Sequence, residues 1–134
     1  MKGHVLIVDD NINNLRIAVD ILIHEKLRIT TAKCGADALK ALDRNDIDII
    51  LLDINMPDMD GFETLKEIHA KPKYANTPVL FVTSHADEDF LERGFNSGGV
   101  DFISKPFRPT EFIARIKPHL SLAQHKAKLQ EIVD

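Results

Sequence analysis

The stretches of sequence that decide the fold are VLIVDD at residues 5–10 and DIILLD at residues 48–53, each a run of aliphatic residues that stops at an acid. A short unbroken apolar run predicts a strand that is buried on both faces, as in parallel sheets covered by helices. The groups at the carboxyl ends of such strands face the ligand crevice of an open parallel sheet. We therefore expect Asp9, Asp10 and Asp53 to meet at one edge of a sheet.

Three carboxylates at one edge require a compensating charge. Two unit charges roughly 4 Å apart repel by about 4 kcal/mol at an effective dielectric constant of about 20. A divalent cation with a preference for oxygen would offset this repulsion. Mg²⁺ is the leading candidate, because it is small and hard and is usually held by one or two carboxylates together with water and phosphate oxygens. The acidic residues thus predict a magnesium site and chemistry on phosphate.

Length and composition exclude several classes of protein. A chain of 134 residues is long enough for one domain and too short for two ordinary ones. Lys and Arg total 17 against 21 Asp and Glu, a net charge of -4, so direct binding to nucleic acid is not expected. The single cysteine, Cys34, excludes an internal disulfide, and no stretch approaches the roughly 20 apolar residues of a membrane span. We expect a cytoplasmic protein that does not bind membranes.

Strand-like runs alternate along the chain with segments of helical periodicity, and this alternation predicts a doubly wound α/β sheet with helices on both faces. The strands are expected at residues 5–8, 28–32, 47–52, 79–82 and 102–104. The helices are expected from 12 to about 25, from 35 or 36, from just after Gly61 to before Pro72, at about 87–97 and from 109 onward.

Two further strand ends carry polar groups that would reach the same edge. Thr83 follows the run VLFV at residues 79–82, and Lys105 follows DFIS at residues 101–104. Carboxylates, a hydroxyl and an ammonium group would then converge. In such a site Asp53 is the candidate nucleophile for a phosphoryl group, Mg²⁺ neutralises charge, and Thr83 and Lys105 bind the phosphoryl oxygens.

From Val5 to about Leu120 the sequence resembles the receiver domain of two-component response regulators. The resemblance lies in VLIVDDN (5–11), LLDINMPDMDGFE (51–63), PVLFVTS (78–84) and VDFISKPF (100–107), which together and in this order are highly specific. It implies a flavodoxin-like sheet of five parallel strands in the order 2-1-3-4-5. It also implies a switch that takes a phosphoryl group from a sensor histidine kinase or a phosphotransfer protein, rather than an enzyme that turns over a metabolite.

The resemblance assigns a role to individual residues. It implies that Asp53 is the phosphoacceptor, that Asp10 and the backbone carbonyl of Asn55 bind Mg²⁺ together with Asp53, and that Asp9 acts on the metal through water. Thr83 and Lys105 match the phosphate-sensing residues. Phe102 matches the aromatic switch and lacks a hydroxyl, so its switching would depend on packing alone. The residues expected to shape the site are Met56, Pro57, Gly61, His85 and Pro106, the last of which would follow a cis peptide bond.

A second class of function is a Mg²⁺-dependent aspartyl-phosphate phosphohydrolase that acts on a small molecule. In the haloacid-dehalogenase pattern the nucleophile and a second acid lie two residues apart on the first strand. Here Asp53 follows the third strand, and the residue two positions later is Asn55. A chain of 134 residues also leaves no room for a cap domain over a substrate. The signalling switch is therefore the preferred interpretation.

The C-terminal residues extend beyond the expected domain. We assign residues 1–120 to the receiver domain and 121–134 to a helical extension or a linker toward an output domain. Leu122, His125, Leu129 and Ile132 alternate spacings of three and four, which is typical of a two-stranded seam, and a frayed tail remains the alternative. Homodimerisation on phosphorylation is left open. Pro118 is expected to bend or end the last helix.

Overall fold

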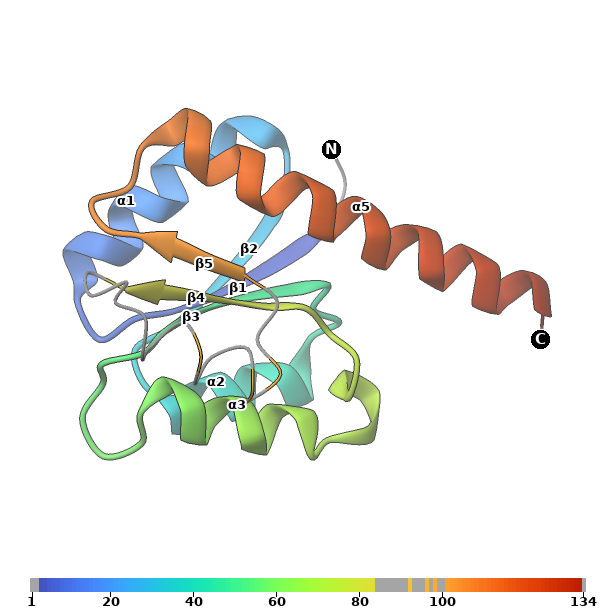
Figure 1. Cartoon of the computed structure of the whole chain (residues 1–134), viewed down its shortest axis with the longest axis horizontal. Coiled ribbons are helices and arrows are strands. Elements are labelled where there is room, and N and C mark those ends of the chain that lie inside the picture. The colour runs from blue at the N-terminus through green and yellow to red at the C-terminus, as the bar shows by residue number, and fades with distance from the viewer. Residues whose placement is uncertain (1–2, 84–91, 93–95, 97, 99–100, 134) are drawn as a thin grey trace.

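A parallel sheet of five strands forms the centre of the structure, which is a computed structural model that describes residues 3–83, 92, 96, 98 and 101–133 (Figure 1). The strand order is β2-β1-β3-β4-β5, as predicted. The strands are β1 (His4–Val8), β2 (Arg28–Ala32), β3 (Ile49–Asp53), β4 (Val79–Thr83) and β5 (Asp101–Ser104). The third strand therefore begins two residues later than predicted and includes Asp53.

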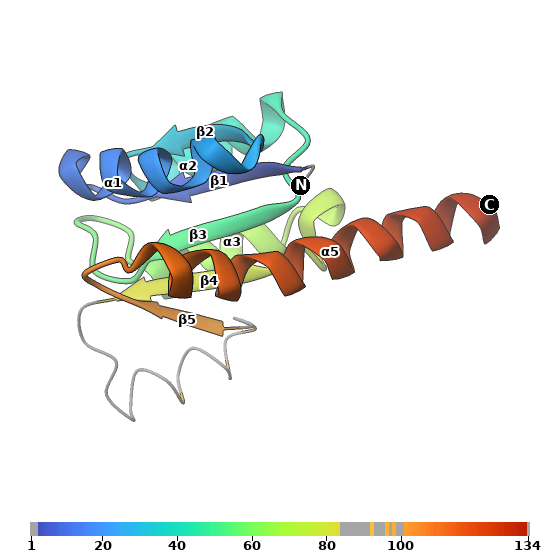
Figure 2. The same cartoon turned by 90° about the horizontal axis from the view of Figure 1, so that it is seen from above.

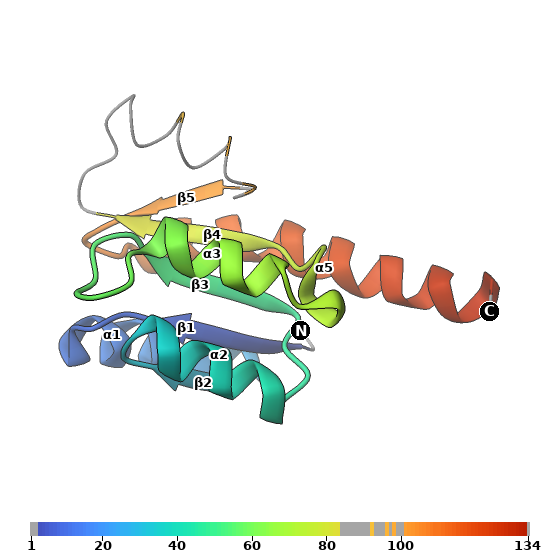
Figure 3. The ribbon, with the colours of Figure 1, turned by 90° about the horizontal axis from the view of Figure 1, so that it is seen from below.

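Helices cover both faces of this sheet. The helices α1 (Ile12–Leu22) and α5 (Pro109–Val133) lie on one face, and α2 (Gly35–Arg44) and α3 (Gly61–His69) lie on the other (Figures 1, 2 and 3). Short 3₁₀ turns follow α1 and α3, at η1 (Ile23–Glu25) and η2 (Pro72–Tyr74). The helix predicted at residues 87–97 falls outside the residues that the structure describes, apart from two isolated positions.

The three central strands are buried along their whole length, which explains why their sequences are unbroken apolar runs. Their side chains alternate between two cores, one on each face of the sheet. Leu6, Leu52 and Phe81 belong to the core beneath α2 and α3. Ile7 and Leu51 belong to the core beneath α1 and α5. The sheet is thus a rigid layer from which the residues at the strand ends project.

The helices that follow β1, β2 and β3 each begin close to the end of the preceding strand, at capping residues. The side chain of Asn11 accepts hydrogen bonds from the backbone N–H groups at the start of α1, and the side chain of Asp60 does so at the start of α3. Cys34 occupies the same position before α2, where its sulfur accepts a bond from the N–H of Asp37. The three loops that follow β1, β2 and β3 are therefore held at their helical ends.

Pro118 was expected to bend or end the last helix, and the second of these expectations is wrong, because α5 continues through it to Val133. Pro118 and Ala114, whose carbonyl loses its helical partner, both lie on the exposed side of α5, so that carbonyl is accessible to solvent. Phe112, Ile116 and Leu120 hold the opposite side in the core at intervals of four residues. The helix extends past the sheet (Figures 1 and 2). No helix in the described part of the chain, α5 included, is long and apolar enough to cross a membrane.

Candidate functional site

The acids predicted to meet do so at the carboxyl edge of the sheet. Asp9 and Asp10 follow β1, Asp53 ends β3, and each offers a carboxylate oxygen within 4.8 Å of the other two. Asp9 and Asp53 are both only 3% exposed, whereas Asp10 is open to solvent. The parallel pairing of β1 with β3 brings these acids together, because it aligns Val8 with Leu52.

Lys105 is the cation that faces two of these acids. Its Nζ lies 3.1 Å from Oδ2 of Asp9 and 3.4 Å from Oδ1 of Asp53. The other oxygen of Asp9 accepts a hydrogen bond of 2.9 Å from the backbone N–H of Asn11. Asp53 accepts a bond from the backbone N–H of Asn55. The cluster itself contains three carboxylates and Lys105, so negative charge remains in excess there.

This excess changes the acidity of Asp53. Burial raises the pKa of its carboxyl group, the neighbouring carboxylate of Asp9 raises it further, and the pKa reaches about 6 although Lys105 and the Asn55 N–H act in the opposite direction. The charged form of Asp53 is therefore disfavoured by its surroundings. A cation bound beside it would relieve this cost.

We expect Asp53→Asn to stabilise the protein in the absence of divalent cations at pH 8, by an amount of the order of 2 kcal/mol. The pKa of Asp53 is raised by folding, so the folded state binds more protons between the unfolded value of 3.8 and about 6. Wild-type stability therefore gains as the pH falls through 6, and the advantage of the variant disappears near pH 4. Urea denaturation with a chelator at pH 8, 6 and 4 measures this difference.

Asp58→Asn is the matched control, because Asp58 is an exposed residue of the loop that follows β3. Its stability relative to wild type should not follow the pH profile of the Asp53 variant. A difference between wild type and Asp53→Asn that stays constant from pH 8 to pH 4 would contradict the assignment of a raised pKa to Asp53.

Thr83 and Lys105 reach the same edge from β4 and β5. Thr83 is buried, lies one residue beyond the partner of Asp53 in the sheet, and is itself paired with Ser104. Its backbone carbonyl accepts a 2.9 Å hydrogen bond from the N–H of Lys105. The peptide bond between Lys105 and Pro106 is cis. The structure thus brings together the hydroxyl residue and the lysine that the sequence placed beside the acids.

The loop between β3 and α3 closes against the backbone of Asp53. Met56 is buried in the core beneath α3, while Asn55 and Pro57 are exposed. The N–H of Gly61 donates to the carbonyl of Ile54 at 2.8 Å. A Cβ atom on Gly61 would lie 2.6 Å from the backbone oxygen of Asp53, so only glycine permits this approach.

Two predicted site residues, Phe102 and His85, remain to be placed. Phe102 is on β5, buried in the core beneath α2 and α3, with its ring against that of Phe81. His85 lies outside the residues that the structure describes.

Sequence reasoning missed two contacts that organise the site. Asn11 donates its backbone N–H to Asp9, and its position immediately before a helix was the available signal. Gly35, at the start of α2, lies against the side chains of Met59 and Thr64, so that α2 supports the β3–α3 loop. A glycine in the first turn of an amphipathic helix indicates such a close approach.

The arrangement is suited to a phosphoryl group and a hard cation. Clustered carboxylate oxygens with no histidine or cysteine among them match the ligand preference of Mg²⁺. The exposed Asp10 opens the cluster to solvent, and Lys105 supplies a positive charge beside Asp53. Fold and site together define a doubly wound α/β domain with an acidic, lysine-containing cluster at the carboxyl edge of its sheet.

Comparison with known proteins identifies the family. Residues 5–117 match the response regulator receiver domain. The response regulator SaeR of Staphylococcus epidermidis is 33% identical over 132 residues, which are 96% of this chain and 56% of SaeR. The structure of the chemotaxis protein CheY4 of Vibrio cholerae is similar with a TM-score of 0.83 at 29% identity, over 90% of this chain and 99% of CheY4. NtrX of Brucella abortus gives a TM-score of 0.88 at 25% identity, over 98% of this chain and 30% of NtrX.

The chain belongs to the response regulator receiver domain family. It is the receiver domain of a two-component response regulator, and its role is regulatory. The chain spans only about half of the length of SaeR, at 56%. The resemblance drawn from the four sequence motifs is confirmed.

Proposed function

We propose that Asp53 accepts a phosphoryl group from a sensor histidine kinase or a phosphotransfer protein. The observation that carries this proposal is the cluster of three carboxylates within 4.8 Å of one another, with Lys105 beside two of them. An oxygen of Asp53 attacks phosphorus, the bond from phosphorus to the imidazole nitrogen of the donor breaks, and the imidazole leaves with the electron pair. The product is an acyl phosphate on Asp53.

The metal in this proposal is Mg²⁺, as in receiver domains generally. We assign Asp10, Asp53 and the backbone carbonyl of Asn55 as its protein ligands, with Asp9 acting through water. The separate role of Asp9 is supported by its contacts, because one oxygen accepts from Asn11 and the other faces Lys105. When bound, the cation neutralises charge on the transferring group.

The new charge is the signal. An acyl phosphate adds about -1.5 to -2 charges at neutral pH if it behaves like other phosphoryl modifications. Lys105, already within 3.4 Å of Asp53, would bind a phosphoryl oxygen, and Thr83 at the neighbouring strand end would bind another. Phe102 would then change its position, and the surface formed by the fourth helix, β5 and α5 would change its affinity for a partner. The fourth helix is outside the described residues, so this surface stays a prediction.

Beryllofluoride, a mimic of the phosphoryl group, tests the proposed site. We expect wild-type protein to give a bound ¹⁹F NMR signal that requires both beryllofluoride and Mg²⁺, because the mimic needs the Asp53 oxygen and the cation together. Asp53→Asn should give no bound signal, whereas Asp58→Asn should give the wild-type signal. A bound signal that persists in Asp53→Asn, or that forms without Mg²⁺, would overturn the proposal.

The phosphohydrolase alternative gains no support. Asn55 is two residues beyond Asp53 and donates its N–H to that carboxylate, where the alternative pattern requires a second acid. Membership of a regulatory family favours the switch. A cytoplasmic location, and the expected absence of binding to nucleic acid and membranes, stay predictions.

The extension of α5 is proposed to connect the receiver to an output domain. The helix runs to Val133, well beyond Leu120, its last residue known to be buried in the core. The similarity to CheY4 covers 90% of this chain and 99% of CheY4, whereas that to NtrX covers 98% of this chain and 30% of NtrX. We therefore propose that residues 1–120 form the receiver domain and that residues 121–134 form the helical extension.

Homodimerisation on phosphorylation is the remaining part of the proposal. We expect light scattering to show a doubled mass when beryllofluoride and Mg²⁺ are added, and no doubling in a variant that ends at Ser121. The physical reason is the alternating spacing of three and four between Leu122, His125, Leu129 and Ile132, which would form a seam between two helices. Identical masses in both conditions would count against a dimer driven by phosphorylation.

A further inference from the structure

Three phenylalanine rings lie in a row beneath the candidate site. The ring centroids of Phe62 and Phe81 are 5.1 Å apart with an interplanar angle of 53°, and those of Phe81 and Phe102 are 5.6 Å apart at 39°. All three side chains belong to the core beneath α2 and α3. These separations and tilts are those at which aromatic pairs attract one another beyond simple burial.

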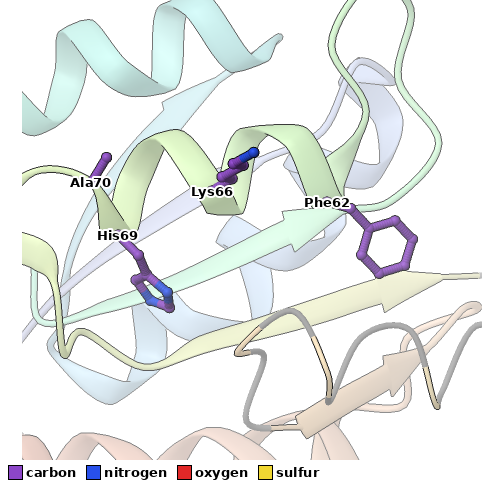
Figure 4. Close-up of a pocket in the computed structure, with 4 residues that line it drawn as sticks. All are labelled: Phe62, Lys66, His69 and Ala70. Atoms are coloured by element: carbon purple, nitrogen blue, oxygen red, sulfur yellow. The ribbon is translucent and has the colours of Figure 1, made fainter.

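The fold places each ring by a different constraint. Phe81 on β4 is aligned with Phe102 on β5 in the parallel pairing, so both side chains leave the sheet on the same face. Phe62 is in the first turn of α3, and its ring points from the helix toward β4 (Figure 4). The row therefore runs from α3 across the end of β4 to β5.

The row lies next to the phosphate-sensing position. Thr83 is two residues beyond Phe81 on the same strand, so the two side chains share one face of the sheet. Phe102 has no hydroxyl group with which to form an outward hydrogen bond. Its ring is therefore positioned by packing, and one packing partner within the described part of the chain is Phe81, which Phe62 contacts in turn.

We propose that Phe81 and Phe62 are positioning residues that hold the ring of Phe102 inward before any phosphoryl group is bound. An outward turn of Phe102 would break its contact with Phe81 and expose a ring that is now only 8% exposed. The row thereby biases the switch toward the inward position. The role of this bias in signalling rests on the proposed function. The packing of the three rings does not depend on that function.

A tryptophan introduced by Phe102→Trp makes the proposal measurable, because the chain contains no tryptophan of its own. In this variant we expect blue-shifted emission and weak acrylamide quenching without ligand. Adding Phe81→Leu should raise the quenching constant by about two- to tenfold, the range that loss of one ring pair implies. Adding Phe62→Leu should have a smaller effect in the same direction, since Phe62 does not pair with residue 102 in the row.

Phe112→Leu is the matched control. Phe112 is fully buried in the core on the other face of the sheet, where its ring packs edge-on against Phe107 at 4.9 Å. The same loss of a ring pair there should leave the quenching of the introduced tryptophan unchanged. Equal quenching in the Phe81→Leu and Phe112→Leu backgrounds would overturn the proposal, because the effect would then be a general loosening of the fold.

The native side chain at residue 102 provides an independent measurement, should tryptophan disturb the fold. NMR of the Phe102 ring in otherwise wild-type protein should show an upfield ring-current shift, which Phe81→Leu reduces. Unchanged Phe102 resonances in Phe81→Leu would contradict the proposal. Both measurements are made without a phosphoryl donor, so their outcome is distinct from a failure of Asp53 to bind beryllofluoride.

Discussion

Replacement of Gly61 by alanine is expected to lower the free energy of unfolding by about 2 to 3 kcal/mol. The added Cβ would lie 2.6 Å from the backbone oxygen of Asp53 and 2.8 Å from the Cα of Ile54. Both contacts are with backbone atoms of a buried central strand and its extension, which have little freedom to move. The collision therefore either separates α3 from β3 or displaces Asp53, the proposed phosphoacceptor.

Gly35→Ala is the matched comparison for this prediction. Gly35 also opens a helix, and a Cβ there would meet Thr64 Oγ1 at 2.6 Å and Met59 Sδ at 2.8 Å. These are side-chain atoms, and the end of a methionine side chain moves at low cost. Both variants gain similar helix propensity, so their difference reports the collision. Urea denaturation should show the larger loss for Gly61→Ala, and equal losses would refute the argument.

The position of the acids was predictable because burial and strand polarity determine it. Short aliphatic runs that end in acid are typical of a strand covered on both faces whose carboxyl end lies at a crevice. Asp9, Asp10 and Asp53 followed from this pattern without further information. The helix start at Ile12 was predicted, and α3 begins at Gly61, one residue before its prediction; in both cases the preceding side chain caps the helix.

Other features depend on contacts that a sequence does not reveal. The two distances from Lys105 to Asp9 and Asp53 result from the spatial order of β1, β3 and β5, which are far apart in the chain. The continuation of α5 past Pro118 depends on which side of that helix is buried. The contact between Phe81 and Phe102 requires the register of two strands. In each case tertiary structure determined the outcome.

The raised pKa of Asp53 indicates that the site favours an additional positive charge. Asp53 is buried beside another carboxylate, and its pKa of about 6 leaves it mostly ionised at neutral pH at an energetic cost. Binding of a cation at Asp10 and Asp53 would offset that cost and draw a phosphoryl donor toward the same oxygens. The burial and repulsion that disfavour an ionised Asp53 therefore favour a cation beside it, as the proposed phosphoryl transfer requires.

Asp53→Asn is expected to abolish covalent phosphorylation completely. An amide has no anionic oxygen to attack phosphorus, and Asp9 and Asp10 occupy different positions around the cation in the proposed arrangement. Asp58→Asn, in the loop that follows β3, should be phosphorylated as well as wild type. Incubation of all three proteins with acetyl phosphate and Mg²⁺, followed by intact-mass measurement, compares them directly.

That mass measurement tests the central claim, namely that the acidic cluster makes Asp53 a phosphoacceptor. The account predicts the gain of one phosphoryl group in wild type and in Asp58→Asn, its dependence on Mg²⁺, and no gain in Asp53→Asn. A phosphoryl group that appears on the Asp53→Asn protein, or an unchanged mass in wild type with Mg²⁺ bound, would contradict it.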